Sequence, residues 1–255
     1  MAEHDSNRAI LYRKRMKRGL LNLQNVTLVS INGTTNSDLS LAALEISARS
    51  IHFGATKLLA ACAPTRPIPP NIEFVVVPKM DWDGYNEFSV KRLVRHVETD
   101  FVLSVQPDGF VLNPLNWRSD FLNFDYIGAP WPWSVSGANP SCRVGNSGFC
   151  LRSRRFLQQT SSLKRPQGMP DDVFFCSLKR LKLEKAGIRF APPKIAARFS
   201  IENPIPENPR GSILHVFGFH GRTTPRARGL CQWLQDWHQA CLPLHRSKTA
   251  SKRLG

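Results

Sequence analysis

The chain has 255 residues, a hydrophobic content of 42% and a formal net charge of +16. This length is sufficient for one sizeable domain with a buried core. No apolar run approaches the ~20 residues needed to span a bilayer, and the first residues lack the apolar stretch of a secretory signal. We therefore expect a cytoplasmic protein without a transmembrane segment.

The positive charge is concentrated at the two ends of the chain. Residues 1–19 carry a net charge of +4 and residues 222–255 a net charge of +6. Basic ends of this kind are more typical of solvated tails than of a nucleic-acid-binding surface. We predict a basic N-terminal extension over residues 1–22, a single domain over 23–221 and a basic C-terminal tail over 222–255, and we do not expect a nucleic-acid partner.

The six cysteines form no Cys-x-x-Cys pair and no zinc-like spacing. Several have apolar neighbours, as Cys176 does after Phe174 and Phe175, which is typical of reduced cysteines in a core. Their distribution therefore favours a reducing, cytoplasmic setting.

Strands and helices alternate in the first part of the chain. A β-branched run predicts a strand over residues 26–31, and the turn-forming Asn32-Gly33 follows it. Apolar residues at helical spacing predict a helix that begins near Ser37 or Asp38, includes Ile51 and stops at Gly54. Strands are predicted over 56–61 and 72–77. This order is typical of a parallel βαβ sheet.

A second helix, predicted over residues 85–97, leads into a strand over 101–105 that is apolar on both faces. Beyond this strand the chain is irregular as far as Val144, as is typical of a binding surface built from loops. A last helix is predicted from about Pro170 to just before Gly187. The predicted fold class is therefore α/β, with a mixed, mainly parallel sheet flanked by helices.

Asp108 stands where the strand over 101–105 ends. In open α/β sheets this end of a strand faces the ligand crevice, and a carboxylate there can hold Mg²⁺ or Mn²⁺. The tripeptide Pro107-Asp108-Gly109 also has the composition of a simple tight turn. Taken alone, the tripeptide favours the turn.

Four further clusters follow the segment Gln106-Pro-Asp-Gly-Phe110. They are Asp125-Tyr-Ile-Gly-Ala-Pro-Trp-Pro-Trp133, Val144-Gly-Asn-Ser-Gly-Phe-Cys-Leu-Arg152, Pro170-Asp-Asp-Val-Phe-Phe-Cys176 and Phe217-Gly-Phe-His-Gly221. In order and spacing the set resembles the GT-A class of nucleotide-sugar glycosyltransferases, and most closely a glycosyltransferase-like family of unknown function. The resemblance extends over roughly residues 26–221. It implies a GT-A-like, Rossmann-like fold that transfers a sugar from a nucleotide-diphosphate donor to a glycan, lipid or protein acceptor.

The resemblance also implies a divalent cation, Mn²⁺ or Mg²⁺, held by Asp108 and His220. The usual GT-A motif is Asp-x-Asp, whereas this chain has Gln106 in the first position. A neutral amide is a poorer ligand for a hard cation than a carboxylate, so binding should be weaker or depend more on the diphosphate. His215 is the nearby competitor of His220, and we expect His96 to be structural.

The resemblance places the acidic pair Asp171-Asp172 where inverting GT-A enzymes keep their base. Asp172 is the candidate base and Asp171 its neighbour, and repulsion between adjacent acids keeps one of them protonatable near neutrality. The alternative is purely structural, because carboxylates in the first turn of a helix are stabilised by the helix dipole.

The remaining candidates are residues that would bind the donor or the acceptor. Trp131 or Trp133 would stack on a sugar ring, unless they plug the edge of the core. Asn146 and Gly148 belong to a loop that would let backbone approach the donor, although the same residues also suit a hairpin turn. Asn32 and Gln106 are further candidates for nucleotide binding, because each lies at the end of a predicted strand.

Two other functions remain possible from the sequence. A sugar nucleotidyltransferase is the nearest, but residues 32–35 after the first strand contain no Gly-rich loop with a cation. A non-catalytic protein that binds nucleic acid through its basic ends is the second. It predicts an affinity that depends steeply on salt concentration.

Overall fold

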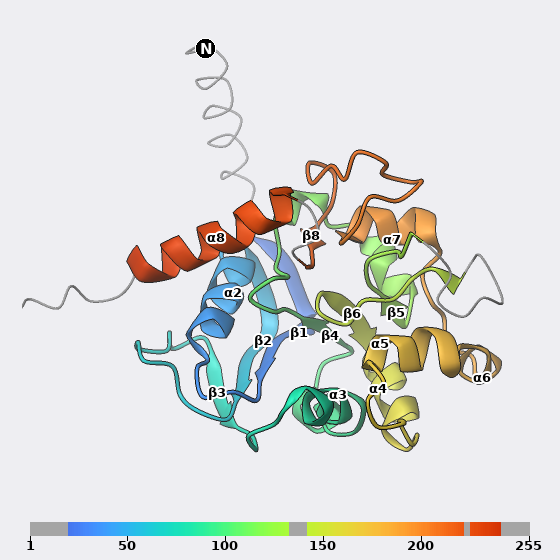
Figure 1. The fold of residues 1–255 in the computed structure, drawn as a ribbon, viewed down its shortest axis with the longest axis horizontal. Coiled ribbons are helices and arrows are strands. Elements are labelled where there is room, and N and C mark those ends of the chain that lie inside the picture. The colour runs from blue at the N-terminus through green and yellow to red at the C-terminus, as the bar shows by residue number, and fades with distance from the viewer. Residues whose placement is uncertain (1–19, 133–141, 222–224, 241–255) are drawn as a thin grey trace, which may run out of the picture.

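A mixed six-stranded sheet forms the centre of the protein. The computed structural model describes residues 20–132, 142–221 and 225–240. The sheet consists of β1 (Leu21–Asn32), β2 (Ile51–Ala60), β3 (Glu73–Val76), β4 (Phe101–Ser104), β5 (Tyr126–Ile127) and β6 (Cys150–Ser153). Its strand order is β3-β2-β1-β4-β6-β5, with the first four strands parallel and β6 antiparallel to both β4 and β5. The predicted α/β class with a mainly parallel sheet is confirmed (Figure 1).

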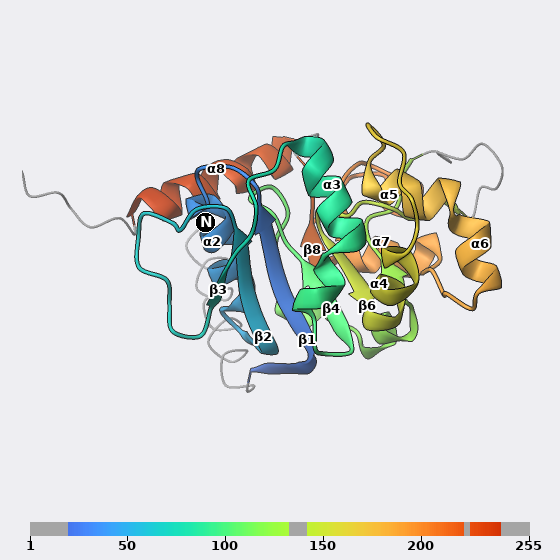
Figure 2. The same ribbon diagram turned by 90° about the horizontal axis from the view of Figure 1, so that it is seen from below.

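Helices cover both faces of the sheet (Figure 2). Val26 and Leu28 of β1 belong to an apolar cluster that includes helix α2 (Asp38–Ala48). Val29 and Ile31 belong to a second cluster with α3 (Trp82–Lys91) and α4 (Arg154–Ser161). Because alternate side chains of a strand point to opposite faces, the apolar run of β1 contributes to both layers.

Helix α8 (Pro225–Ala240) lies in the segment predicted as a basic tail, and it packs across α2 (Figure 1). Ala42 and Ala43, on the outer side of α2, share a third apolar cluster with Cys231 and Leu234 of α8. Helix α2 is therefore covered by the sheet on one side and by α8 on the other. Part of the predicted tail thus packs onto the domain.

The end of the first predicted helix is wrong. Helix α2 ends at Ala48, and β2 begins at Ile51, which pairs in parallel with Leu21. Helical spacing alone could not reveal this pairing. Gly54 lies inside β2, where a Cβ atom would come within 2.1 Å of the carbonyl oxygen of Gln24. Gly54 is therefore a point of close backbone approach rather than a helix stop.

Each of the two later predicted helices is divided into shorter pieces in the structure. The helix predicted over 85–97 begins at Trp82 and divides into α3 and a 3-10 turn, and the one predicted from Pro170 divides into three pieces. Helices α4 and α7 and strands β5 to β8 were not predicted. The elements not yet given are the 3-10 turns Leu93–His96, Pro114–Asn116 and Ser119–Asn123, α5 (Asp171–Val173), a π-helical turn (Phe174–Leu178), α6 (Arg180–Lys185), α7 (Pro193–Phe199), β7 (Ser200–Ile201) and β8 (Gly218–Phe219).

The described residues bear on two expectations from the sequence, which concern transmembrane segments and the state of the cysteines. In the three described ranges, no helix combines the length and apolar character that crossing a membrane requires. The five cysteines in these ranges are all free, and four of them are buried. Cys241 lies outside the described residues.

Candidate active site

His220 and Asp108, far apart in sequence, lie side by side at the carboxyl edge of the main sheet. Strand β8 pairs in parallel with β7, and the amide of His220 donates to the carbonyl of Ile201 at 2.9 Å. The amide of Gly221 donates to the carbonyl of Asp108 at 2.7 Å. Asp108 itself lies in a turn after β4, which two backbone hydrogen bonds close between Gln106 and Gly109. Asp108 therefore lies in a tight turn and also at the carboxyl edge of the sheet, so the two interpretations of this segment do not exclude each other.

Both ring nitrogens of His220 have partners. Nδ1 lies 2.9 Å from Nδ2 of Asn146, and Nε2 lies 3.2 Å from Oε1 of Gln106. Oδ1 of Asn146 accepts from the amide of Gly148 at 3.1 Å, so the amide nitrogen of Asn146 faces the ring. Nε2 of Gln106 donates to the hydroxyl of Tyr85 at 2.6 Å. For the neutral ring, these two contacts fit the tautomer with its proton on Nε2.

Close backbone approach defines the loop over residues 145–148. Asn146 has φ of 66°, a left-handed conformation that Asn tolerates. A Cβ atom on Gly148 would lie 1.9 Å from Nε2 of His220, and one on Gly145 would lie 1.8 Å from Cζ2 of Trp131. The absence of a side chain on these two glycines therefore leaves room for the rings of His220 and Trp131. In this arrangement the space beside them is not open to a donor.

Trp131 does not form the exposed platform on which a sugar ring could stack. Trp131 is 6% exposed and packs in the core, which matches the structural alternative. Trp133 lies outside the described residues. An exposed indole that we did not predict is Trp82, 56% exposed at the start of α3. The same helix carries Tyr85, whose hydroxyl contacts Gln106.

Acidic side chains surround His220. Oδ1 of Asp108 lies 3.7 Å from Nε2, and Oε1 of Glu202 lies 3.5 Å from Nδ1. Burial alone would lower the pKa of His220, but the hydrogen bond to Glu202 and the charges of Asp108, Glu202 and Asp172 outweigh it and raise the pKa. The acidic surroundings therefore favour the protonated ring, in which Nδ1 carries a proton toward Glu202 and no longer accepts from Asn146. Glu202 was not predicted, because it follows a strand of two residues that has no signal in the sequence.

The two members of the acidic pair have different surroundings. Asp171 is buried, and its Oδ2 accepts from the Ser89 hydroxyl at 2.5 Å and lies 3.9 Å from Nη1 of Arg152. Asp172 is half-buried, and its Oδ1 accepts from the amide of Val173 at 2.7 Å. Burial, and next the charge of Asp171, raise the pKa of Asp172 to about 7. Asp172 can therefore exchange a proton near neutrality.

The side chains present fit a cation that arrives with a diphosphate better than one held by the protein alone. Among the residues that the structure describes, no group of three or more His, Cys, Asp or Glu side chains is arranged to hold a metal ion. Mg²⁺ is commonly held by one or two carboxylates together with substrate phosphates. The Asp108 carboxylate is 31% exposed and can serve as such a ligand.

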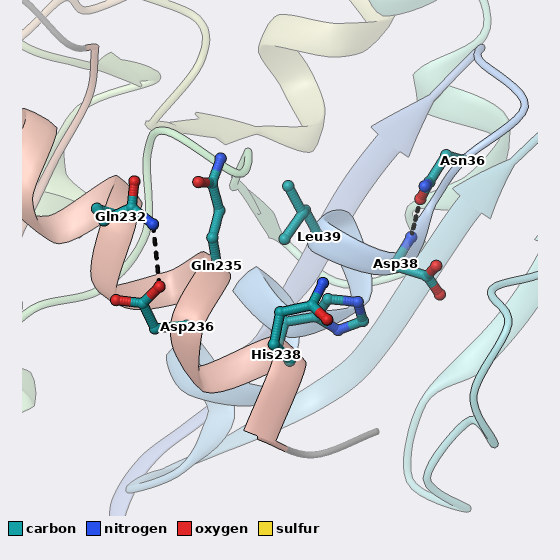
Figure 3. Close-up of a pocket in the computed structure, with 8 residues that line it drawn as sticks. Asn36, Asp38, Leu39, Gln232, Gln235, Asp236 and His238 are labelled. Carbon is teal, nitrogen blue, oxygen red and sulfur yellow. Dashed lines mark hydrogen bonds between the residues drawn. The ribbon is translucent and has the colours of Figure 1, made fainter. Parts of the chain in front are cut away.

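Asn32 shapes a loop instead of facing the site. Its Nδ2 donates to the carbonyl of Asn36 and to the hydroxyl of Ser40, and its Oδ1 accepts from Thr34. On this loop and α8 lies a hollow of about 340 Å³ (Figure 3). None of the residues around His220 lines it. Its lining consists of Asn36, Asp38, Leu39, Gln232, Gln235, Asp236, His238 and Gln239.

His215 and His96 play no part in this cluster. His215 is exposed, and His96 stacks on Phe88 with a ring-centroid separation of 5.7 Å. Of the predicted site residues that the structure describes, it thus brings together those around His220 and leaves out Trp131 and Asn32. The assembled residues are Gln106, Asp108, Asn146, Gly148, Asp172 and His220.

Fold and site together define an α/β protein with an acidic, histidine-centred cluster at the carboxyl edge of its sheet. The chain belongs to the family described as "Protein of unknown function (DUF5672)", which matches residues 74–215. This span includes Asp108, Asn146 and the acidic pair, and it ends before His220. Among solved structures, the chain is similar to the crystal structure of A197 from STIV, with 12% identity, a TM-score of 0.33, and coverage of 67% of this chain and 80% of that chain. No curated protein matches the sequence.

Proposed function

We propose that the protein is a glycosyltransferase that moves a sugar from a nucleotide-diphosphate donor to an acceptor hydroxyl, with Asp172 as the general base. The observation that carries this proposal is the acidic cluster at the carboxyl edge of the sheet, in which Asp108 and Glu202 lie 3.7 Å and 3.5 Å from the ring nitrogens of His220 and Asp172 acts on the same ring. The order of the sequence motifs, which resembles GT-A glycosyltransferases, supports the same function. The description of the family names no activity, so it neither supports nor opposes this function.

Charge around the site favours a divalent cation as part of the donor complex. The charged groups that act most strongly on His220 are the carboxylates of Asp108, Glu202 and Asp172. A diphosphate approaching three carboxylates is repelled unless a cation lies between them. Mn²⁺ or Mg²⁺ would neutralise charge on the departing diphosphate. Asp108 would hold the cation, and His220 would be a second ligand once its ring no longer hydrogen-bonds with Gln106.

Asp172 has the properties that an acceptor base needs. A base works best when its pKa lies near the operating pH, because it is then ionised in a useful fraction and still accepts a proton readily. The pKa of Asp172, raised to about 7 by burial and by Asp171, meets this condition. The deprotonated carboxylate would take the proton of the acceptor hydroxyl as the hydroxyl oxygen attacks the anomeric carbon and the diphosphate leaves. Free, buried cysteines are compatible with a cytoplasmic location for this reaction.

A screen of nucleotide sugars by thermal shift, with and without Mn²⁺, tests the proposal. A ligand at one hundred times its Kd stabilises the native state by about 2.7 kcal/mol. In a chain of this size that raises the melting temperature by several degrees. We expect a UDP- or GDP-sugar to give such a shift, and Mn²⁺ to increase it.

Asp108→Asn is expected to abolish the Mn²⁺-dependent part of this shift, because an amide is a poor ligand for a hard cation. Asp120→Asn is the matched control, since Asp120 is a turn carboxylate with 32% side-chain exposure against 31% for Asp108. The control should keep the full shift. An equally Mn²⁺-dependent shift in Asp108→Asn would reduce Asp108 to a turn residue, and a wild-type protein that no nucleotide sugar stabilises would contradict the function.

A further inference from the structure

The hollow beside α2 and α8 has the size of a binding site for a small molecule. Its volume of about 340 Å³ lies at the lower end of the range for such sites, roughly 300–1,000 Å³. One wall is formed by residues 36–39 at the start of α2, and the other by side chains between residues 232 and 239 on α8 (Figure 3). None of these residues belongs to the His220 cluster, so a ligand in the hollow would not occupy that cluster.

The chemistry of the lining favours a neutral ligand that both donates and accepts hydrogen bonds. Amides predominate, and each offers two N–H donors and an oxygen acceptor. Carboxylates add acceptors, and none of the lining residues that the structure describes is a lysine or an arginine. A phosphate or another anion would therefore meet negative charges without a cation to balance them. The amides are those of Asn36, Gln232, Gln235 and Gln239, and the carboxylates those of Asp38 and Asp236.

The wall at the start of α2 is held in place by hydrogen bonds within the protein. Nδ2 of Asn32 donates to the carbonyl of Asn36 at 2.9 Å and to the hydroxyl of Ser40 at 3.0 Å. Oδ1 of Asn36 accepts from the amide of Asp38 at 3.0 Å, and the Asp38 carboxylate accepts from the amide and the hydroxyl of Thr65. Because Oδ1 of Asn36 is engaged in this way, its Nδ2 is the atom that can donate to a ligand. A wall fixed beforehand reduces the entropy that binding must overcome.

A buried histidine borders the hollow on the α8 side. Ala227, Cys231, Leu234 and His238 recur at helical spacing and form the buried face of this helix. The first three pack in the apolar cluster with α2, whereas His238, 5% exposed, lines the hollow. Its Nδ1 has no hydrogen-bond partner among the residues described, and an apolar side chain would fill this position without that cost. A polar molecule in the hollow therefore explains the imidazole better than the packing of α8 on α2 does.

We propose that the hollow binds a sugar ring, as a carbohydrate site separate from the His220 cluster. A sugar hydroxyl both donates and accepts hydrogen bonds, which matches a lining of mixed amides and carboxylates. Asp236, whose Oδ1 accepts from Gln232 at 2.9 Å, keeps Oδ2 for a hydroxyl of the ligand. Leu39 supplies an apolar contact for the carbon atoms of the ring.

An organic ammonium ion is the nearest alternative occupant. The two carboxylates would attract it, but it has only donors and would leave the amide N–H groups of the lining without acceptors. A sugar satisfies both kinds of group. The inference goes beyond the proposed function, because a sugar can bind here whether or not the protein transfers one.

Saturation-transfer NMR of the full chain with single sugars tests the proposal. The probes are the methyl glycosides of glucose, galactose, mannose and N-acetylglucosamine. A ligand of this size typically reaches a Kd on the order of 1 mM, which the method detects. We expect at least one probe to receive saturation, and neither putrescine, a diamine, nor inorganic phosphate to displace it. Displacement by either ion would overturn the proposal, as would a protein that binds none of the four sugars well above this concentration.

Gln235→Leu removes the hydrogen-bonding groups of one lining amide and keeps most of its volume. A ligand hydroxyl that loses its partner costs about tenfold in affinity, so the Kd of the bound probe should rise by about that factor. Gln159→Leu is the matched control, because Gln159 lies on α4 and does not line the hollow. The control should leave the Kd unchanged. A Gln235→Leu variant that binds the probe with the wild-type Kd would overturn the proposal.

Amide NMR of the ¹⁵N-labelled chain locates the bound probe without any substitution. Shift changes should fall on residues 36–39 and 232–239 and not on Asp108 or His220. Changes confined to the His220 cluster would overturn the proposal, because the sugar would then occupy the candidate active site. A protein that binds sugar in the hollow but transfers none would refute the proposed function alone. A transferase that binds no sugar in the hollow would refute this inference alone.

Discussion

Gly148→Ala should destabilise the protein through one contact, that between the loop over 145–148 and the ring of His220. A Cβ atom on Gly148 would lie 1.9 Å from Nε2, 2.2 Å from Cδ2 and 2.7 Å from Cε1 of His220. Ordinary contacts of a Cβ atom begin at 3.4 Å, so Nε2 must retreat by about 1.5 Å. A ring displaced this far loses Asn146, now 2.9 Å from Nδ1, and Gln106, now 3.2 Å from Nε2.

The magnitude follows from these two effects. Each lost hydrogen bond costs about 1 kcal/mol, and the added methyl group in a filled site costs about 1–3 kcal/mol in displaced neighbours. Because the ring relieves part of the overpacking as it moves, we expect a total loss of about 2–4 kcal/mol in the free energy of unfolding.

Urea denaturation of a double-mutant cycle measures the effect and identifies its cause. If the ring is what the methyl group meets, His220→Ala should remove the clash, and Gly148→Ala should cost little in that background. The expected coupling is about 1–3 kcal/mol. Gly229→Ala in α8 is the control, because a Cβ atom there meets nothing within 4 Å and should stabilise the helix by up to about 1 kcal/mol. Effects of Gly148→Ala and His220→Ala that add within about 0.5 kcal/mol would refute the contact.

Two further predictions concern carboxylates. The pKa of Asp172 is raised to about 7 in the folded protein, above about 3.9 in the unfolded chain, so its stabilising contribution is full below about pH 4 and is lost as the pH rises to 7. Asp172→Asn should therefore raise stability at pH 7.5 by up to about 4 kcal/mol, and by only about 1.5 kcal/mol at pH 5, while it lowers turnover by about 10²–10⁴-fold. An equal gain in stability at both pH values, or normal turnover, would count against a base role. Asp125 is the opposite case, because hydrogen bonds from Arg155, Ser153 and Arg189 overcome the effect of burial and lower its pKa. Asp125→Asn should cost about 2–4 kcal/mol at pH 7 in urea denaturation, and the difference should shrink as the pH falls below about 4, since the wild-type carboxylate then takes up a proton; a difference independent of pH would show that packing, not charge, is lost.

Local patterns determine a large part of this fold. The apolar run over residues 26–31 indicates a strand buried on both faces, and β1 contributes to both layers because its side chains alternate. The turn at Asp108 is an equally local feature, because turn chemistry depends on neighbours in the chain. For the same reason the sequence alone places Asp108, at the end of a predicted strand, at the ligand edge of the sheet.

The amino-acid sequence by itself thus determined the α/β class, the first strands and the candidates Asp108, Asp172 and His220. Only the tertiary structure decided what each candidate touches, because those contacts join segments that no periodicity relates. It paired Ile51 with Leu21, where helical spacing had predicted helix, and it buried Trp131 over Gly145. It also brought Glu202 and Arg152 into the site through β7 and β6, short strands whose pairing depends on distant partners.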